Sequence, residues 1–148
     1  MANLEKHIEN IRKFNIQPVV AINSFTNDTQ EEVDLVIKAC KALDVEAVVS
    51  NGWAKGGEGT RELASAVKKV VESAQSSFTP LYDWKSPVKE KIEKIAREIY
   101  GATSVSYDKK AQLNLRRIER LGFNDFAICM AKTQKSFSDD DSLIGRPE

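Results

Sequence analysis

The sequence predicts an α/β fold in which helices flank a layered, locally parallel sheet. Two observations lead to this prediction. Apolar residues in the first half of the chain alternate between helical spacing and the short continuous runs that are typical of strands. The chain has 148 residues, of which 41% are hydrophobic, and this is enough to bury one sizeable core.

The first predicted helix and strand lie at the N-terminal end. One helix face carries apolar residues at helical spacing, with Asn3 as a candidate N-cap: Leu4, Ile8, Ile11 and Phe14. The run Pro18–Ile22 is continuous, apolar and rich in β-branched residues. This pattern predicts a strand that is buried on both faces.

A second helix, a second strand and a third helix follow. Thr29 and Glu32 have the spacing of a capping box, and a stripe behind them predicts a buried helix face: Val33, Val36, Ile37, Cys40 and Leu43. A strand is predicted at Val45–Val49 and a glycine-rich loop at Gly52–Gly59, after which helical spacing resumes at Leu63. The order of these elements predicts parallel pairing of the two strands.

The second half is predicted to be mainly helical, and the boundary is expected between residues 75 and 76. Ser86 is a candidate cap for a helix with Pro87 at its first position, and Gly101 is placed to end that helix. Another helix is expected to end at Gly122. The apolar run Phe126–Ala131 predicts a final strand, and a polar tail follows it.

Composition argues against several classes of protein. The 22 basic and 22 acidic residues balance, which disfavours nucleic acid or a membrane surface as a partner. No run reaches the ~18 apolar residues of a membrane span, and the N-terminus is too polar for a secretory signal, so we expect a cytoplasmic protein.

Cys40 and Cys129 lack metal or disulfide spacing and are expected to be buried thiols. The single histidine, His7, offers little for a metal site.

The segment Ser50–Thr60 lies between a predicted strand and a predicted helix, which is the setting of a phosphate-binding loop. Gly52 and Gly57 have the spacing of the first two glycines of a P-loop. That motif requires lysine after the second glycine, where this chain has Glu58, and a carboxylate would repel phosphate. We therefore reject a self-contained P-loop. The alternative is a turn whose glycines permit positive φ.

Two aromatic residues follow the two predicted strands, Phe25 after the first and Trp53 after the second. Ligands of open α/β sheets collect outside the carboxyl ends of parallel strands, so the two rings could flank one flat heterocycle. Alternatively, each ring only covers the rim of the sheet. Asp28 could orient a polar edge of such a ligand, or it could cap the helix that follows Thr29.

No motif in the chain assigns a reaction. The sequence contains no nucleophile elbow, HExxH, CxxC or EF-hand pattern. Lys132 and Lys135 could hold an anion, although a solvated loop explains them equally well. From Lys85 to Arg120 there are ten basic and five acidic residues, a surplus that a solvated helix face also explains. Composition and spacing alone support an α/β ligand-binding domain.

Seven consecutive blocks of the sequence resemble the formate–tetrahydrofolate ligase family, also called formyltetrahydrofolate synthetase. They are NLEKHIENIRKF, PVVAINSFTNDT, WAKGGEG, PLYD, KIEKIAREIYGA, LGF and CMAKTQKSFSDDDSLIGRP. The resemblance covers essentially the whole chain but only an internal stretch of the family's length. It implies a fragment of a larger P-loop-related enzyme, without the N-terminal P-loop portion and without the C-terminal portion.

The resemblance implies a parent enzyme that uses ATP and Mg to join formate to tetrahydrofolate, giving 10-formyltetrahydrofolate, and that is a homo-oligomer. The family's phosphate-binding and formate-binding residues lie upstream of Asn3. We therefore expect that the isolated chain binds no ATP or Mg and is inactive. The other reading is a non-catalytic folding or interaction module with no ligand of its own.

The resemblance also implies site residues. The two aromatics that sandwich the pterin in the family match Phe25 and Trp53, and a leucine that lines the pocket matches Val49. Thr26 stands where the family usually has proline, which changes the shape of the tetrahydrofolate pocket. Three further residues are candidates for contacts with nucleotide or phosphate: Asn23, Asp28 and Lys55.

Overall fold

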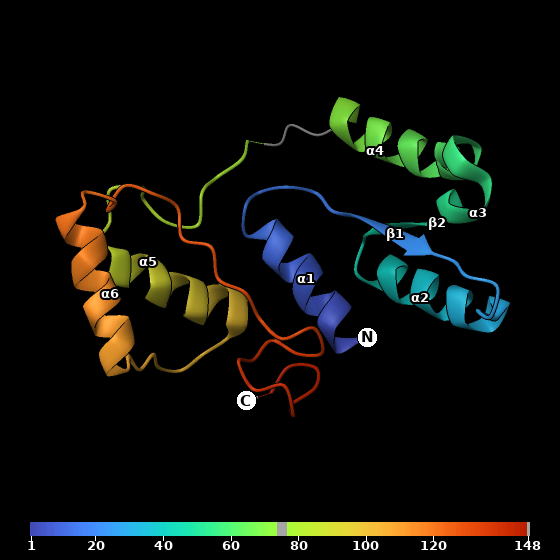
Figure 1. Ribbon diagram of the computed structural model, residues 1–148. Helices are drawn as coiled ribbons and strands as arrows, with labels where there is room; N and C mark the ends of the chain where they lie inside the picture. Colours follow the sequence, from blue (N-terminus) through green and yellow to red (C-terminus); the bar gives the residue numbers. More distant parts are fainter. Residues whose placement is uncertain (74–76, 148) are drawn as a thin grey trace. The chain divides into compact units, whose positions relative to one another are not determined.

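The computed structural model describes residues 1–73 and 77–147 (Figure 1). Packing divides the chain into two compact units. Asn15–Phe78 form the sheet unit, and Ala2–Phe14 together with Thr79–Glu148 form the helical unit. The boundary predicted between residues 75 and 76 lies outside the described residues. The α/β class predicted from the sequence is confirmed.

Within the described residues, the sheet of the sheet unit has two strands, β1 (Val19–Asn23) and β2 (Glu46–Ser50). They pair in parallel, with Val19 opposite Glu46 and Asn23 opposite Ser50, as predicted. The expectation that β1 is buried on both faces is wrong, since Ala21 is exposed. A neighbouring strand pairs along the edge of β1, and burial of both faces would require helices packed on each side of the sheet.

Helix α2 (Gln30–Ala42) connects the two strands, and its start confirms the predicted capping box. The Thr29 hydroxyl accepts a hydrogen bond from the Glu32 amide, and the Glu32 carboxylate accepts one from the Thr29 amide at 2.9 Å. The predicted stripe buries Val33 and Cys40, and Cys40 has no exposed surface. Burial raises the pKa of the Cys40 thiol, because a thiolate loses its hydration there.

The segment predicted as a glycine-rich loop is helical, so that prediction is wrong. It contains α3 (Gly52–Lys55) and the 3₁₀-helix η1 (Gly56–Thr60), which lead into α4 (Arg61–Ser73). The two ends of this helical segment meet, because the Asn51 amide donates to the Gly59 carbonyl at 3.0 Å. A Cβ atom at Gly59 would lie 2.5 Å from the Asn51 carbonyl oxygen, so this close approach requires glycine.

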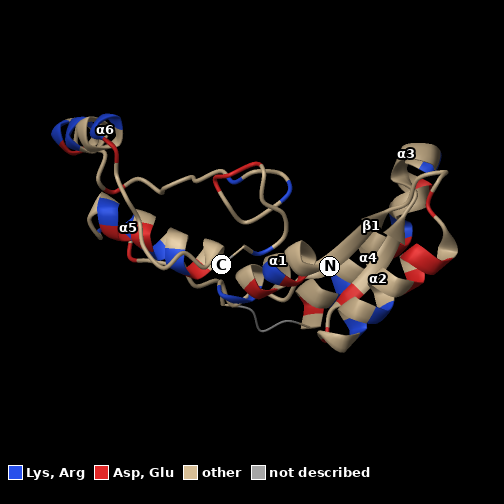
Figure 2. Ribbon diagram, turned by 90° about the horizontal axis from the view of Figure 1, so that it is seen from below, with Lys and Arg blue, Asp and Glu red and all other residues tan. Residues whose placement is uncertain are grey.

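The helical unit contains α1 (Ala2–Arg12), α5 (Val88–Ile95), the π-helix η2 (Ala96–Tyr100) and α6 (Lys109–Arg120). In Figure 2, α6 carries more Lys and Arg than Asp and Glu. Gly101 ends η2 with φ of 81°, as predicted for a left-handed terminator. The N-cap of α5 is Pro87 rather than Ser86. Asn3 is not a cap, because α1 begins before it and its amide donates to the Lys135 carbonyl at 2.8 Å.

The strand predicted at Phe126–Ala131 is wrong, since the described residues of this run are not in a strand. The backbone groups of this run form hydrogen bonds with side chains, and not with a neighbouring strand. The Phe126 carbonyl accepts from Lys91 Nζ at 3.2 Å, and the Ile128 amide donates to the Tyr82 hydroxyl at 2.9 Å. Cys129, expected to be buried, is exposed on this irregular segment.

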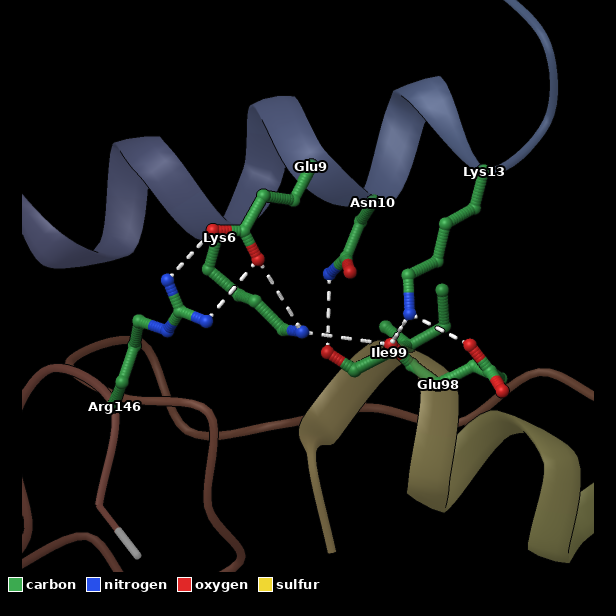
Figure 3. A network of polar contacts seen from close by, with 7 residues as sticks. All are labelled: Lys6, Glu9, Asn10, Lys13, Glu98, Ile99 and Arg146. Carbon is green, nitrogen blue, oxygen red and sulfur yellow. Dashed lines mark hydrogen bonds and ion pairs between the residues drawn. The ribbon is translucent and has the colours of Figure 1, made fainter.

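Polar contacts attach α1 to the rest of the helical unit (Figure 3). Lys13 Nζ lies 2.7 Å from the Glu98 carboxylate, and the Asn10 amide donates to the Ile99 carbonyl at 3.1 Å. Ile8, on the same helix, is 2% exposed. Helix α1 is thus held by a buried apolar contact and by bonds to the end of η2.

The two units are joined where the chain passes between them twice. In the helical unit, the Thr79 amide donates to the Phe14 carbonyl at 3.0 Å. In the sheet unit, the Asn15 side-chain amide donates to both the carbonyl and the hydroxyl of Ser77, each at 3.0 Å. Each unit therefore holds its own two chain ends together.

Among the described residues, the helices are too short or too polar to cross a membrane.

Candidate functional site

The candidate site lies at the carboxyl ends of β1 and β2. The ladder extends one residue beyond the strands, because the Ser24 amide donates to the Ser50 carbonyl at 3.2 Å. From there one chain turns at Phe25 and the other enters α3 at Gly52. Parallel pairing in this register brings Phe25 and Trp53, which are 28 positions apart, to the same edge of the sheet.

The Phe25 and Trp53 rings stack on one another. Their centroids are 5.8 Å apart and their planes differ by 22°. Both side chains remain exposed, 57% for Phe25 and 58% for Trp53. The indole N–H of Trp53 donates to the Ser24 carbonyl at 2.6 Å. Two large aromatic rings thus lie together with more than half of each residue's surface exposed.

The gap between the rings is too small for a third ring. A flat heterocycle needs a contact distance of about 3.5 Å on each face, or ~7 Å between the flanking rings. The observed 5.8 Å is smaller, so a ligand that enters between them must displace one ring. Trp53 is tethered by its hydrogen bond to Ser24, whereas Phe25 has an apolar side chain on an exposed turn. Rotation of Phe25 is therefore the less costly movement.

The turn that carries Phe25 is closed by Asp28. The Phe25 amide donates to the Asp28 carboxylate at 2.8 Å, and the Asp28 amide donates to the Phe25 carbonyl at 3.1 Å. Thr29, not Asp28, is the N-cap of α2. Thr26 is exposed inside the turn. Of the two alternatives that the sequence left open for Asp28, the structure excludes the cap and shows its carboxylate bonded to the turn.

The remaining predicted residues lie around this edge of the sheet unit. Val49 is half-buried in β2 opposite Ile22, and Asn23 is exposed at the end of β1. Lys55 is exposed at the end of α3. Ser24 was not predicted as a site residue, because a backbone carbonyl acceptor leaves no signal in the sequence.

The structure gives Glu58 a partner. Its carboxylate lies 3.1 Å from the guanidinium of Arg61, on the outer surface of the unit. Both residues line a surface cavity of about 540 Å³, which is also lined by Glu46, Glu62, Ser65, Ala66 and Lys69. None of the predicted site residues lines this cavity. Its mixed charges and two further carboxylates do not form a phosphate cradle.

Lys132, the other candidate for anion binding, is engaged inside the helical unit. Its Nζ donates to the Thr133 carbonyl at 2.8 Å and lies 5.0 Å from the centroid of the Phe137 ring. The His7 ring packs against the same ring at a tilt of 55°, with centroids 4.8 Å apart. Loss of water around the imidazole, together with the charge of Lys132, lowers the pKa of His7. Lys135 is exposed.

In the part of the chain that the structure describes, no group of three His, Cys, Asp or Glu side chains is arranged to hold a metal ion.

Comparison with known proteins gives a match over the whole chain. The family model described as "Formate--tetrahydrofolate ligase" matches residues 1–148. The chain is 48% identical over 148 residues to the "Formate--tetrahydrofolate ligase" of Limosilactobacillus fermentum (strain NBRC 3956 / LMG 18251). That alignment covers 100% of this chain and 27% of the relative, so the chain spans about a quarter of the relative's length.

Proposed function

Because the chain belongs to the formate–tetrahydrofolate ligase family, we propose that it supplies one wall of the pterin-binding site in a longer ATP-dependent ligase. That ligase joins formate to tetrahydrofolate and gives 10-formyltetrahydrofolate. The parent enzyme is a cytoplasmic homo-oligomer. The observation that carries the proposal is the stacked pair Phe25–Trp53 at the carboxyl edge of a parallel sheet.

The chemistry of the pair suits a pterin. A pterin is flat and aromatic, and it gains both burial and stacking energy against exposed aromatic faces. Phe25 and Trp53 leave more than half of their surfaces open for this contact. Val49 and Thr26 belong to the same edge and complete the proposed wall. Phe25 turns aside to admit the pterin, while Trp53 keeps its bond to Ser24.

The described residues do not fit ATP. The helical turn Gly52–Thr60 presents Glu58 and Arg61 as a pair in place of a phosphate cradle. We assign no step of phosphoryl transfer to this chain and propose that ATP and Mg bind elsewhere in the parent enzyme. Contacts with nucleotide or phosphate at Asn23 and Lys55 remain a minor part of the proposal.

The test is calorimetric titration of the 148-residue chain with tetrahydrofolate under anaerobic conditions. We expect weak binding and a roughly fivefold or greater loss of affinity in Trp53→Ala, since stacking adds about 1 kcal/mol beyond buried area. The matched control is Trp84→Ala, which removes the other tryptophan, in the helical unit. It should leave the affinity unchanged.

Two results contradict the proposal. Equal affinity of the wild-type chain and Trp53→Ala removes the assigned stacking surface. Formate-dependent ATP hydrolysis by this chain alone contradicts the assignment of the phosphate chemistry to other parts of the parent enzyme.

A further inference from the structure

The peptide group that joins Ser24 to Phe25 is bonded at both of its polar atoms. Its carbonyl oxygen accepts the indole N–H of Trp53 at 2.6 Å, and its N–H donates to the Asp28 carboxylate at 2.8 Å. Phe25 carries its own ring directly next to this peptide. The orientation of one peptide plane therefore bears on both rings of the pair.

Hydrogen bonds of the neighbouring backbone hold the residue that carries this carboxylate, Asp28. The Asp28 amide donates to the Phe25 carbonyl at 3.1 Å, which closes the turn from the other side. The next residue, Thr29, is locked as N-cap by the capping box with Glu32. The backbone of Asp28 is therefore held between a closed turn and a capped helix, which limits the positions that its carboxylate can take.

We propose that Asp28 is a positioning residue for the Phe25–Trp53 pair and acts through the Ser24–Phe25 peptide. A hydrogen bond to an ionised acceptor is stronger than one between neutral groups. It also polarises the peptide, which makes the carbonyl at the other end a better acceptor for the indole. Asp28 therefore holds the backbone from which the Phe25 side chain projects, and it strengthens the hydrogen bond that tethers Trp53.

This assignment differs from a direct contact between Asp28 and a ligand. The carboxylate oxygen that faces the turn is already used by the Phe25 amide. The meaning of the arrangement for function rests on the proposed pterin site, because it would hold Trp53 still while Phe25 moves. The arrangement itself is present without any ligand and can be tested without one.

The experiment is hydrogen exchange of the Trp53 indole N–H, followed by nuclear magnetic resonance in the 148-residue chain without folate. A Trp84→Phe background leaves one indole resonance. In Asp28→Ala we expect exchange of this proton to accelerate about threefold to tenfold, the range that corresponds to loss of one net hydrogen bond. The Phe25 amide resonance should shift upfield, because its acceptor is gone.

Two variants separate positioning from general destabilisation. Asp28→Asn keeps a side-chain oxygen for the Phe25 amide but loses the charge, so it should restore part of the protection of the indole. Asp34→Ala makes the same substitution within α2, where Asp34 accepts from the Gln30 side chain at 2.8 Å, and should leave the indole unchanged.

Unchanged indole exchange in Asp28→Ala overturns the inference, even if tetrahydrofolate binds in a Trp53-dependent way. Equal acceleration in Asp34→Ala also overturns it, since the effect would then come from α2 as a whole. Conversely, accelerated exchange confined to Asp28→Ala supports the inference even if the chain binds no folate, a result that would refute only the proposed function.

Discussion

Glu9 and Arg146 are 137 positions apart in the sequence and are joined by two parallel hydrogen bonds of 2.8 and 3.1 Å (Figure 3). Two bonds between a guanidinium and a carboxylate fix orientation as well as distance. The pair attaches the C-terminal tail of the helical unit to α1. It also makes this attachment sensitive to acid.

The first prediction concerns pH. The hydrogen bonds from Arg146, helped by its charge and that of Lys6, lower the pKa of Glu9 below its ordinary value of 4.5. A lowered folded-state pKa gives stability that is present above the unfolded value and is lost as the pH falls through the folded value. We expect Glu9→Gln to lower the thermal midpoint at pH 7, and the difference from wild type to shrink as the pH falls below 4.5.

Circular dichroism between pH 3 and 7 measures this difference. Glu5→Gln is the control, because it makes the same substitution at another acidic residue of α1, in the first turn of that helix. A loss of stability in Glu9→Gln that is the same at every pH would contradict the role of the ionised pair.

The second prediction concerns the close approach at Gly59. A Cβ atom there would lie 2.5 Å from the carbonyl oxygen of Asn51 and 2.7 Å from its carbon, so the backbone of the turn must shift. We expect Gly59→Ala to destabilise the sheet unit by about 1–3 kcal/mol, the usual cost of overpacking. The turn carries Trp53, whose emission in a Trp84→Phe background reports unfolding in urea.

Gly57→Ala is the matched control. A Cβ atom there meets nothing within 4 Å, and its φ is not positive. Its stability should stay equal or rise by up to about 1 kcal/mol, because alanine restricts the unfolded chain. Equal destabilisation by the two substitutions would show that loss of glycine flexibility, and not the contact with Asn51, is responsible.

The third prediction concerns Lys91, which is fully buried in α5. Its Nζ donates to the carbonyls of Asn124 at 2.5 Å and of Phe126 at 3.2 Å. Lys91→Met keeps the length of the side chain but leaves both carbonyls without their donor. We expect the free energy for local opening of the segment around Phe126 to fall by about 1.5–3 kcal/mol, the usual contribution of hydrogen bonds to charged groups.

Chymotrypsin cleavage at Phe123 and Phe126 measures that loss, since both side chains are exposed and only the backbone must open. Lys94→Met, on the exposed face of the same helix, is the comparison and should be cut at the wild-type rate. Wild-type cleavage of Lys91→Met would show that packing alone holds the segment.

Local chemical signals made part of this fold predictable. The capping box at Thr29 and Glu32 requires only two side chains at fixed spacing, and the structure has both of its bonds. Parallel pairing of β1 and β2 followed from the alternation of strand and helix, and it led to the expectation that Phe25 and Trp53 meet. The binding role of these rings stays a prediction.

Features that depend on a distant partner were not predictable. The apolar run at Phe126 has strand composition, but its carbonyl is taken by Lys91, 35 positions away. The helical form of the glycine segment depends on Asn51 and Gly59 meeting across the turn. The separation of the two rings depends on the tether to the Ser24 carbonyl, and every residue has such a carbonyl.

The bonds between Phe14 and Thr79, and between Asn15 and Ser77, give the chain a nested organisation. The residues that carry the aromatic pair leave the helical unit and return to it through adjacent positions. The segment between Phe14 and Thr79 is therefore replaceable. A short glycine–serine linker between these two residues would close the helical unit without a change in the path of its own backbone. Insertions, deletions or exchanges within this segment would therefore leave the path of the helical unit unchanged.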